Sequence, residues 1–394
     1  MDKMTSRERV MLALQHQEPD RVPWDCTFSI DGYMNLKRYL GLTIKEDPRP
    51  SNNWLAVQPP VEVLKELCSD LYYIGLGRAR DMPSFEYGMD RYTDEWGVTY
   101  RKVLQPSGSF DYQFEKHPLR DAKTRDLEHY DWPDPDDSGR IEGLAEKCEY
   151  LHKNTDFALV GKFATSIFEQ AFYLRSLEQW LIDLALDPEF AGALMDKLTD
   201  IAIGMARASL RACGRHIQIL RLAGDDMGHQ RGTIISPEMF RKLVKPRFTR
   251  LYSAAKTDFL NYNPNGKLMV HVDGDVYPII EDYIGMGLDI LNPVQPHVSE
   301  MEHTRLKREF GSRLSFHGGM DIQGVLVSGT PAEVKTEARK TIATLAGKGG
   351  YILAPTHYLQ SDVPPDNIMA LRDAILEYGL YPLAISTVNK PAES

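Results

Sequence analysis

The chain has 394 residues, of which 42% are hydrophobic and 26% are charged, a composition typical of soluble globular proteins. Its formal net charge is −10 and its basic residues form no cluster, which argues against nucleic acid and anionic membranes as partners. The first residues lack the apolar core of a signal sequence, and no stretch has the ~18 apolar residues of a membrane span. We therefore expect a cytoplasmic protein.

Early in the chain, the sequence predicts one helix and one short strand. Thr5 and Glu8 stand at the two positions of a capping box, so a helix begins after Thr5. It ends before Pro19, because the residue that precedes a proline is disfavoured in a helix. Residues 20–25 follow as a short strand. Residues 45–140, rich in proline and aromatic residues, are predicted to be an elaboration of short strands and long loops.

Strands and helices alternate from about residue 155 onwards. Apolar runs typical of strands occur at 157–163, 217–223, 268–271, 290–293, 314–317 and 351–354. Helical patterns lie between them, at 176–186, 187–213 and 331–346. Alternation of this kind indicates a parallel sheet with both faces covered. With one or two strands near the N-terminus, the count approaches that of a (β/α)8 TIM barrel.

We therefore predict a distorted (β/α)8 TIM barrel with an elaborated N-terminal region, formed by residues 1–394 as a single domain. The alternative is an open, doubly wound sheet, but no G-x-G-x-x-G turn follows any strand. The four cysteines are widely spaced and form no C-x-x-C pair, which argues against a disulfide framework and a cysteine-rich zinc site.

Polar residues follow several of the predicted strands directly. They are Asp226, His271, Asp273, His317 and His357. Taken singly, a histidine at a strand end is more often structural than a ligand, and Asp-Gly is a common turn dipeptide. Taken together, they exceed what turns require, and polar side chains at the carboxyl ends of barrel strands are expected to form an active site.

Three of these residues form a candidate metal site. His271 and Asp273 are two positions apart, so an alternating strand would point both side chains to one face. His357 follows the last strand, which barrel closure places beside the first. Two histidines and one carboxylate are a plausible three-ligand set that leaves one metal position open.

Several motifs also resemble a known family. They lie at residues 4–14, 18–23, 224–226, 235–240, 245–247, 271–274, 291–295, 355–357 and 364–367. In combination they are similar to the uroporphyrinogen decarboxylase superfamily over about residues 4–380. The resemblance implies a distorted (β/α)8 barrel. Porphyrinogen decarboxylases carry an arginine-rich segment near the N-terminus, but here Trp24-Asp-Cys-Thr-Phe28 follows Pro23, so that activity is disfavoured.

The resemblance also implies a second chemistry, that of zinc-dependent methyltransferases that act with corrinoid proteins. In the thiol-methylating members, a His-x-Cys pair and a distant cysteine hold zinc, whereas this chain has Asp273 and His357 at the cysteine positions. Imidazole and carboxylate ligands leave a harder, more Lewis-acidic ion than thiolates do. We therefore predict a zinc site of His271, Asp273 and His357 that activates a methoxylated aromatic donor, whose methyl group passes to a Co(I) corrinoid protein.

Other residues are assigned roles in this hypothesis. Asp226 and Glu169 are candidates for a fourth ligand or for the proton donor to the leaving oxygen, and His317 for orienting the substrate or a ligand. Aromatic side chains at the strand ends are candidates for the walls of the substrate site, although core packing explains them equally well. These are Phe163, Phe168 and Tyr358.

Three alternatives stay open on the sequence alone. One is a metal-free decarboxylase or lyase that uses Asp226 and His271 as electrostatic and acid–base groups. Another is a methylcobalamin:thiol methyltransferase, and the third is a barrel that only binds a ligand or a partner protein. The methyl donor and the choice between a monomer and a homodimer are also left open.

Overall fold

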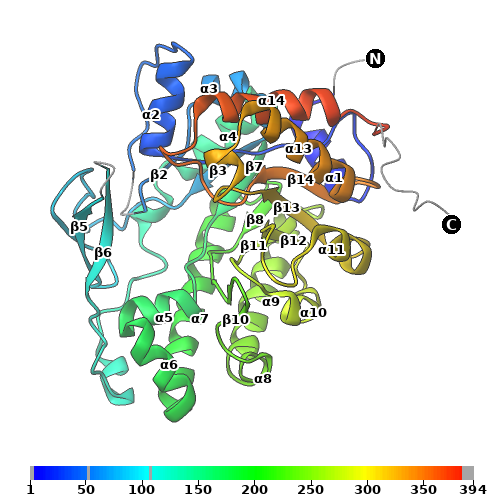
Figure 1. The fold of residues 1–394 in the computed structure, drawn as a ribbon. Helices are drawn as coiled ribbons and strands as arrows, with labels where there is room; N and C mark the ends of the chain where they lie inside the picture. The colour runs from blue at the N-terminus through cyan, green and yellow to red at the C-terminus, as the bar shows by residue number, and fades with distance from the viewer. Residues whose placement is uncertain (1–3, 51–53, 106–108, 384–394) are drawn as a thin grey trace.

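The computed structural model describes residues 4–50, 54–105 and 109–383. Its centre is a seven-stranded parallel sheet that curls into a barrel (Figure 1). In spatial order, its strands are β14 (Tyr351–Pro355), β13 (Ser315–Met320), β12 (Ile290–Val294), β11 (Lys267–His271), β8 (Ile219–Arg221), β7 (Ala158–Lys162) and β3 (Leu71–Gly75). The barrel and the six strands predicted from residue 155 onwards are confirmed.

The segment 22–25 closes the barrel between the two edge strands. On one side, Leu353 N donates to Pro23 O and Asp25 N donates to Leu353 O, both at 2.9 Å. On the other side, Asp70 N, just before β3, donates to Trp24 O at 2.9 Å. This is the predicted strand at 20–25, reduced to isolated bridges at Arg21 and Trp24. This segment takes the place of the eighth strand of the barrel.

Asp70 holds this closure together. Its buried carboxylate accepts from Arg9 Nη1 at 2.7 Å, from Arg21 Nη1 at 2.7 Å and from Trp24 N at 2.9 Å. Arg9 lies in the first helix, so one side chain joins that helix, the closing segment and the start of β3. Removing one partner of a buried ion pair is strongly destabilising, because a charge is then left uncompensated.

The amino end of the barrel is filled by apolar side chains. Helix α1 (Ser6–Leu14) begins at the predicted capping box, in which Glu8 N donates to Thr5 Oγ1 at 3.2 Å. Its Val10 and Leu14 pack against side chains that point inward from the strands. These are Leu71, Ala158, Val160, Ile219, Met269, Ile290 and Ile352. Layers of this kind make the interior of such a barrel a packed core rather than a pore.

The same inward face becomes polar two residues further along most strands. Because side chains alternate along a strand, the residue two positions after an inward apolar residue also points inward. These residues are Tyr73, Lys162, Arg221, His271 and Asn292. The barrel therefore has an apolar floor and, at the carboxyl ends of its strands, a polar mouth.

The region at 45–140 was predicted only in part. Short strands and loops are confirmed, since β4 (Arg91–Thr93), β5 (Thr99–Leu104) and β6 (Phe110–Lys116) form an antiparallel sheet beside the barrel (Figure 1). However, β3 also lies in this region and is a barrel strand. Its tyrosine-rich sequence, Leu71-Tyr-Tyr-Ile-Gly75, did not stand out from the aromatic residues around it.

The remaining elements surround the barrel (Figure 1). The other helices are α2 (Ile30–Tyr39), α3 (Val61–Glu66), α4 (Leu144–Asn154), α5 (Phe168–Arg175), α6 (Leu177–Leu186), α7 (Pro188–Cys213), α8 (Pro237–Met239), α9 (Lys245–Tyr262), α10 (Ile280–Gly285), α11 (His303–Phe310), α12 (Val325–Ser328), α13 (Pro331–Leu345) and α14 (Pro365–Tyr378). Short elements are η1 (Thr124–Glu128), η2 (Ser138–Ile141), η3 (Phe240–Val244), η4 (Tyr277–Ile279), β1 (Phe28–Ser29), β2 (Ala56–Val57), β9 (Gly228–His229) and β10 (Gly232–Thr233). Among the described residues, no helix combines the length and apolarity needed to cross a membrane.

We expect Asp70→Asn to lower the free energy of unfolding by about 3–5 kcal/mol, since it leaves the buried Arg9 and Arg21 without their full counter-charge. Urea denaturation followed by tryptophan fluorescence would measure the loss. Lys153→Gln, which breaks an exposed ion pair with Glu149 on α4, is the control and should leave the transition unchanged. Equal transitions for Asp70→Asn and the control would contradict the role of Asp70.

Candidate metal centre

The three predicted metal ligands meet at the mouth of the barrel. His271 ends β11, Asp273 lies two residues further on, and His357 lies two residues beyond the end of β14. One potential ligand atom from each lies within 4.8 Å of the others, and all three residues are partly buried. His271 Nε2 is 3.6 Å from Asp273 Oδ2. The structure therefore brings together residues 86 positions apart in the sequence, as the barrel hypothesis required.

A chain of hydrogen bonds across the barrel fixes the orientation of His271. Its Nδ1 lies 2.8 Å from Asn292 Oδ1, while Asn292 Nδ2 lies 2.7 Å from His317 Nδ1. His317 Nε2 in turn lies 3.0 Å from Asp25 Oδ2, which also accepts from the Tyr73 hydroxyl at 2.6 Å. An amide oxygen only accepts, so this pattern implies that His271 carries its proton on Nδ1. Its Nε2 lone pair is then left for a metal.

His317 is buried and linked to His271 through Asn292, so it supports a candidate ligand that is a histidine rather than a carboxylate. Its contact with a substrate stays a prediction. The sequence analysis missed Asn292 and Asp25, which complete this support. Asn292 lies inside a strand that reads as an ordinary apolar run, and Asp25 lies on the closing segment. Only the alternation of inward-facing positions could have pointed to them.

The donor set fits a divalent metal ion. Asp273 Oδ1 is buried, and no hydrogen-bond partner among the described residues satisfies it. Burial alone would raise the pKa of Asp273, but the neighbouring His271, His357 and Arg221 hold that pKa below its usual value. Burial and the proximity of His271 lower the pKa of His357 to about 4. At neutral pH the cluster thus offers a carboxylate and a neutral imidazole, which are the states that bind metal.

Two further acidic residues lie beside the cluster. Burial and the charges of Asp226 and Asp225 raise the pKa of Glu169, in the first turn of α5, to about 9, so at neutral pH it is a protonated acid. Asp226 Oδ1 accepts from Asp273 N at 2.8 Å. A Cβ atom at Gly224 would lie 3.0 Å from His271 Cδ2 and 3.5 Å from Glu169 Oε2, so this glycine permits their close approach.

Asp225 positions the helix that carries Glu169. Its buried carboxylate accepts from three backbone N–H groups at the start of α5, those of Ile167, Phe168 and Glu169, at 2.6–3.1 Å. Burial, partly offset by these bonds, raises the pKa of Asp225 to about 7. A carboxylate at a helix N-terminus is stabilised by the unpaired N–H groups there. Of these two adjacent acidic residues, Asp225 therefore stabilises the start of α5, whereas Asp226 contacts the loop of Asp273.

The three predicted aromatic walls differ in their surroundings. Phe163 and Phe168 are completely buried in the main apolar core. Tyr358 is partly buried, and its ring centroid lies 3.9 Å from that of His357. Contact of any of the three with a substrate stays a prediction, and Tyr358 is the one with both exposed surface and a place beside the metal ligands.

Lys162 and Arg221 were missed by the sequence analysis. They are the last residues of β7 and β8, and they point inward two positions after Val160 and Ile219. Desolvation at the barrel mouth and the charge of Arg221 lower the pKa of Lys162, although solvent reaches this side chain and screens part of the effect. A charged residue at an inward position of an otherwise apolar strand was the available signal.

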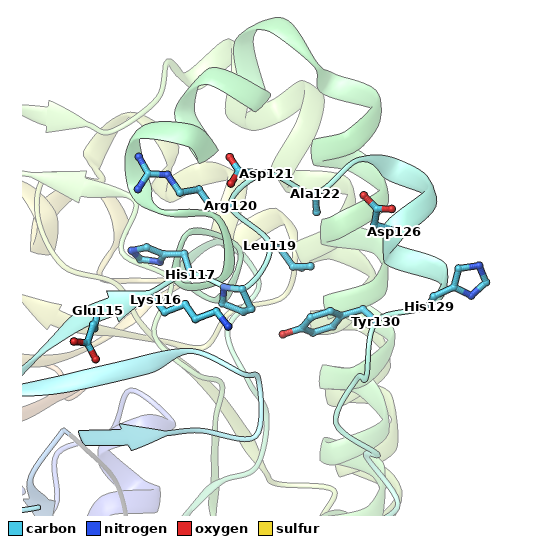
Figure 2. A pocket seen from close by; sticks show the side chains of 11 residues that line it. Glu115, Lys116, His117, Leu119, Arg120, Asp121, Ala122, Asp126, His129 and Tyr130 are labelled. Atoms are coloured by element: carbon cyan, nitrogen blue, oxygen red, sulfur yellow. The ribbon is translucent and has the colours of Figure 1, made fainter. Parts of the chain in front are cut away.

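A separate hollow of about 650 Å³ lies in the elaborated region (Figure 2). It is lined by Glu115, Lys116, His117, Pro118, Leu119, Arg120, Asp121, Ala122, Asp126, His129 and Tyr130. Figure 2 shows these side chains at the end of β6 and on the segments that follow it, and none of the predicted site residues is among them. The hollow is therefore distinct from the metal cluster.

Comparison with known proteins gave a match to one family. A model of the family described as Uroporphyrinogen decarboxylase (URO-D) matches residues 110–378, more than half of the chain. A solved structure, the methyltransferase from Methanosarcina mazei, superposes with a TM-score of 0.64 and 20% identity, covering 95% of this chain and 99% of the other. At this identity the likeness concerns the fold.

Two curated proteins match this chain over a smaller share of its length. The chain is 24% identical over 230 residues to a methylated-thiol–coenzyme M methyltransferase of Methanosarcina mazei, covering 58% of this chain and 57% of the relative. It is 27% identical over 195 residues to a uroporphyrinogen decarboxylase of Syntrophotalea carbinolica, covering 48% and 49%. The chain thus spans about half the length of the curated relatives it matches.

We expect Asn292→Ala to weaken metal binding by about 10–100-fold, because His271 then loses the partner that holds its ring and its tautomer. Competition with a chromophoric zinc chelator would measure the affinity. The control is Asn367→Ala, which removes another buried asparagine whose Nδ2 donates to Leu326 O and Gly329 O. If both variants bind zinc as tightly as the original chain, Asn292 does not support the ligand.

Proposed function

The chain belongs to the uroporphyrinogen decarboxylase family, and we propose that it is a zinc-dependent methyltransferase that acts with a corrinoid protein. The methyl group would pass from a small methylated substrate to the Co(I) corrinoid of that partner. The observation that carries the proposal is the cluster of His271, Asp273 and His357, with an unsatisfied buried oxygen on Asp273. The match to a curated protein named as a methylated-thiol–coenzyme M methyltransferase supports the reaction class.

A methoxylated aromatic compound is the proposed methyl donor. When bound by two imidazoles and one carboxylate, zinc supplies a Lewis acid for the ether oxygen. No cysteine belongs to the cluster, and Cys26, Cys148 and Cys213 are buried elsewhere in the core. The absence of thiolate ligands from this cluster favours an oxygen substrate over a thiol.

Glu169 is the proposed proton donor. In the transfer, the bond between oxygen and the methyl carbon breaks, and its electron pair stays on the oxygen. The corrinoid of the partner protein would supply, as Co(I), the electron pair for the new bond to the methyl carbon, and Glu169 would give its proton to the oxygen. The raised pKa of Glu169 keeps that proton available at neutral pH. Asp226, which accepts from Asp273 N, would hold the loop that carries the ligand.

A methylated thiol is the second candidate donor. It is favoured by one specific observation, the similarity to a protein named as a methylated-thiol–coenzyme M methyltransferase. The ligand set argues against it, since imidazole and carboxylate ligands leave a harder ion that suits the oxygen of an ether better than the sulfur of a thioether. The two candidates are separated by the same assay, because a thioether donor and an aryl ether donor can be offered to one preparation.

The remaining alternatives make different predictions about metal. A decarboxylase or lyase of the same family, with Asp226 and His271 as acid–base groups, would keep its activity without metal. A barrel that only binds a ligand or partner would show no catalytic effect of changes at the mouth.

As further parts of the proposal, the chain acts as a single domain of residues 1–394 in the cytoplasm, without nucleic acid or membrane as partners. A homodimer is compatible with it.

We expect the purified chain to contain about one zinc ion, and His271→Ala or His357→Ala to remove it, since each takes away one of three protein ligands. Elemental analysis by mass spectrometry would measure the content. Methyl transfer to Co(I) corrinoid protein, followed by the absorbance of methylcobalamin, should fall to background in both variants. His129→Ala, in the separate hollow, serves as the control. A metal-free preparation with full activity would refute the zinc mechanism.

We expect Glu169→Gln to retain zinc but to slow methyl transfer from aryl ethers by about a hundredfold or more, because the leaving oxygen loses its proton source. The deficit should grow as the leaving phenol becomes more basic, which single-turnover rates for a series of substituted anisoles would show. Glu178→Gln, an exposed acid in the first turn of α6, is the matched control. A deficit that does not depend on the leaving group would assign Glu169 a structural role.

A further inference from the structure

Two cations stand side by side at the mouth of the barrel. Lys162 of β7 and Arg221 of β8 are in-register partners in neighbouring parallel strands, which lie about 4.8 Å apart. Both side chains point inward, as do Val160 and Ile219 two residues earlier. The next strand, β11, ends on the metal ligand His271. The cation pair therefore lies beside the metal cluster and on the same face of the sheet.

Lys162 and Arg221 are both without a bonded partner in the part of the chain that the structure describes. Among the residues that the structure describes, no side chain forms a hydrogen bond or an ion pair with Lys162 or Arg221. Three carboxylates act on Arg221 at longer range, but each has another partner. Asp25 accepts from His317 and Tyr73, Asp226 accepts from Asp273 N, and Asp273 belongs to the metal cluster.

The pair is also accessible. Lys162 is exposed to solvent although it points into the barrel, and its in-register neighbour on β3, Gly75, is exposed as well. The other inward-facing polar residues at the mouth, such as Asn292 and His317, are buried and hydrogen-bonded to one another. The mouth thus has a bonded half on β12 and β13 and an unbonded, cationic half on β7 and β8.

We propose that Lys162 and Arg221 bind the carboxylate of the substrate, so that the methyl donor is a methoxylated carboxylic acid; this inference rests on the proposed function. A guanidinium forms two parallel hydrogen bonds to a carboxylate, and an ammonium adds a compact charge. The carboxylates of Asp25, Asp226 and Asp273 nearby favour a singly charged group over a doubly charged phosphate. The anchored acid would present its methoxy group to the neighbouring metal cluster.

Ligand binding without any methyl transfer tests this inference. Zinc-loaded protein would be titrated with 4-methoxybenzoate and with its neutral isostere, 4-methoxybenzamide, by isothermal titration calorimetry. We expect the acid to bind about tenfold to a hundredfold more tightly than the amide, as expected for charge-assisted hydrogen bonds. Methoxyacetate and inorganic phosphate, offered in parallel, distinguish an aromatic acid from an aliphatic acid and from a phosphate site.

Variants of Lys162 and Arg221 test whether these two residues cause the preference for the acid over the amide. Lys162→Met and Arg221→Met should each reduce the advantage of the acid over the amide, while Lys162→Arg should retain most of it. The matched control is Lys267→Met, an inward-facing lysine at the opposite end of the barrel, at the start of β11. Lys162 forms no bond that the fold depends on, so its replacement should leave thermal unfolding unchanged.

The outcomes separate this inference from the proposed function. Equal affinity for acid and amide in the original chain, a preference that survives both methionine variants, tighter phosphate binding, or no binding of either probe would each overturn the carboxylate site. A preference for the acid without methyl transfer to Co(I) corrinoid protein would leave the carboxylate site standing and refute the methyltransferase. Methyl transfer from neutral methoxyarenes as fast as from the acid would refute the carboxylate site and leave the methyltransferase standing.

Discussion

The ion pairs of Asp70 are the interaction on which the rest of this structure depends. A parallel sheet of seven strands has two open edges. The segment 22–25 joins them through one isolated bridge, from Trp24 to Leu353 on β14, and one backbone hydrogen bond, from Asp70 N to Trp24 O. Asp70 compensates by binding Arg9, Arg21 and Trp24 N at once. Closure at this point also sets the position of Asp25, which follows directly on the same segment. The fold and the site are therefore linked through adjacent residues.

From Asp25, the polar chain runs through His317 and Asn292 to His271. Each member is held by the next, so the tautomer of His271, a candidate metal ligand on β11, is linked to a carboxylate on the closing segment. Buried polar networks of this kind are rigid when every member is satisfied. Two carboxylate oxygens are buried without a hydrogen-bond partner among the described residues, Asp25 Oδ1 at the start of this network and Asp273 Oδ1. Of the two, Asp273 belongs to the candidate metal cluster.

The barrel and the proximity of the three predicted ligands could both be inferred from the sequence, because both inferences rest on local patterns. Apolar runs mark strands, and residues at strand ends meet in a closed barrel. The sequence did not predict β3, whose aromatic residues lie in an aromatic region, nor the roles of Asn292, Lys162 and Arg221. These depend on which face of a strand points inward, and that face is fixed by the packing of α1 against Val160 and Ile219.

The two halves of the barrel mouth differ in how many hydrogen bonds a side-chain replacement would break. At the mouth, His271 on β11, Asn292 on β12 and His317 on β13 are hydrogen-bonded in series, so replacing one disturbs the next and with it the candidate metal site. On β7 and β8, Lys162 and Arg221 form no hydrogen bond or ion pair with other described residues, so replacing either breaks no bond in the barrel. Their charges do act on the candidate ligands, since Arg221 contributes to the low pKa of Asp273. Under the proposed function, the hydrogen-bonded half would therefore carry the reaction, and the cationic half would select the substrate.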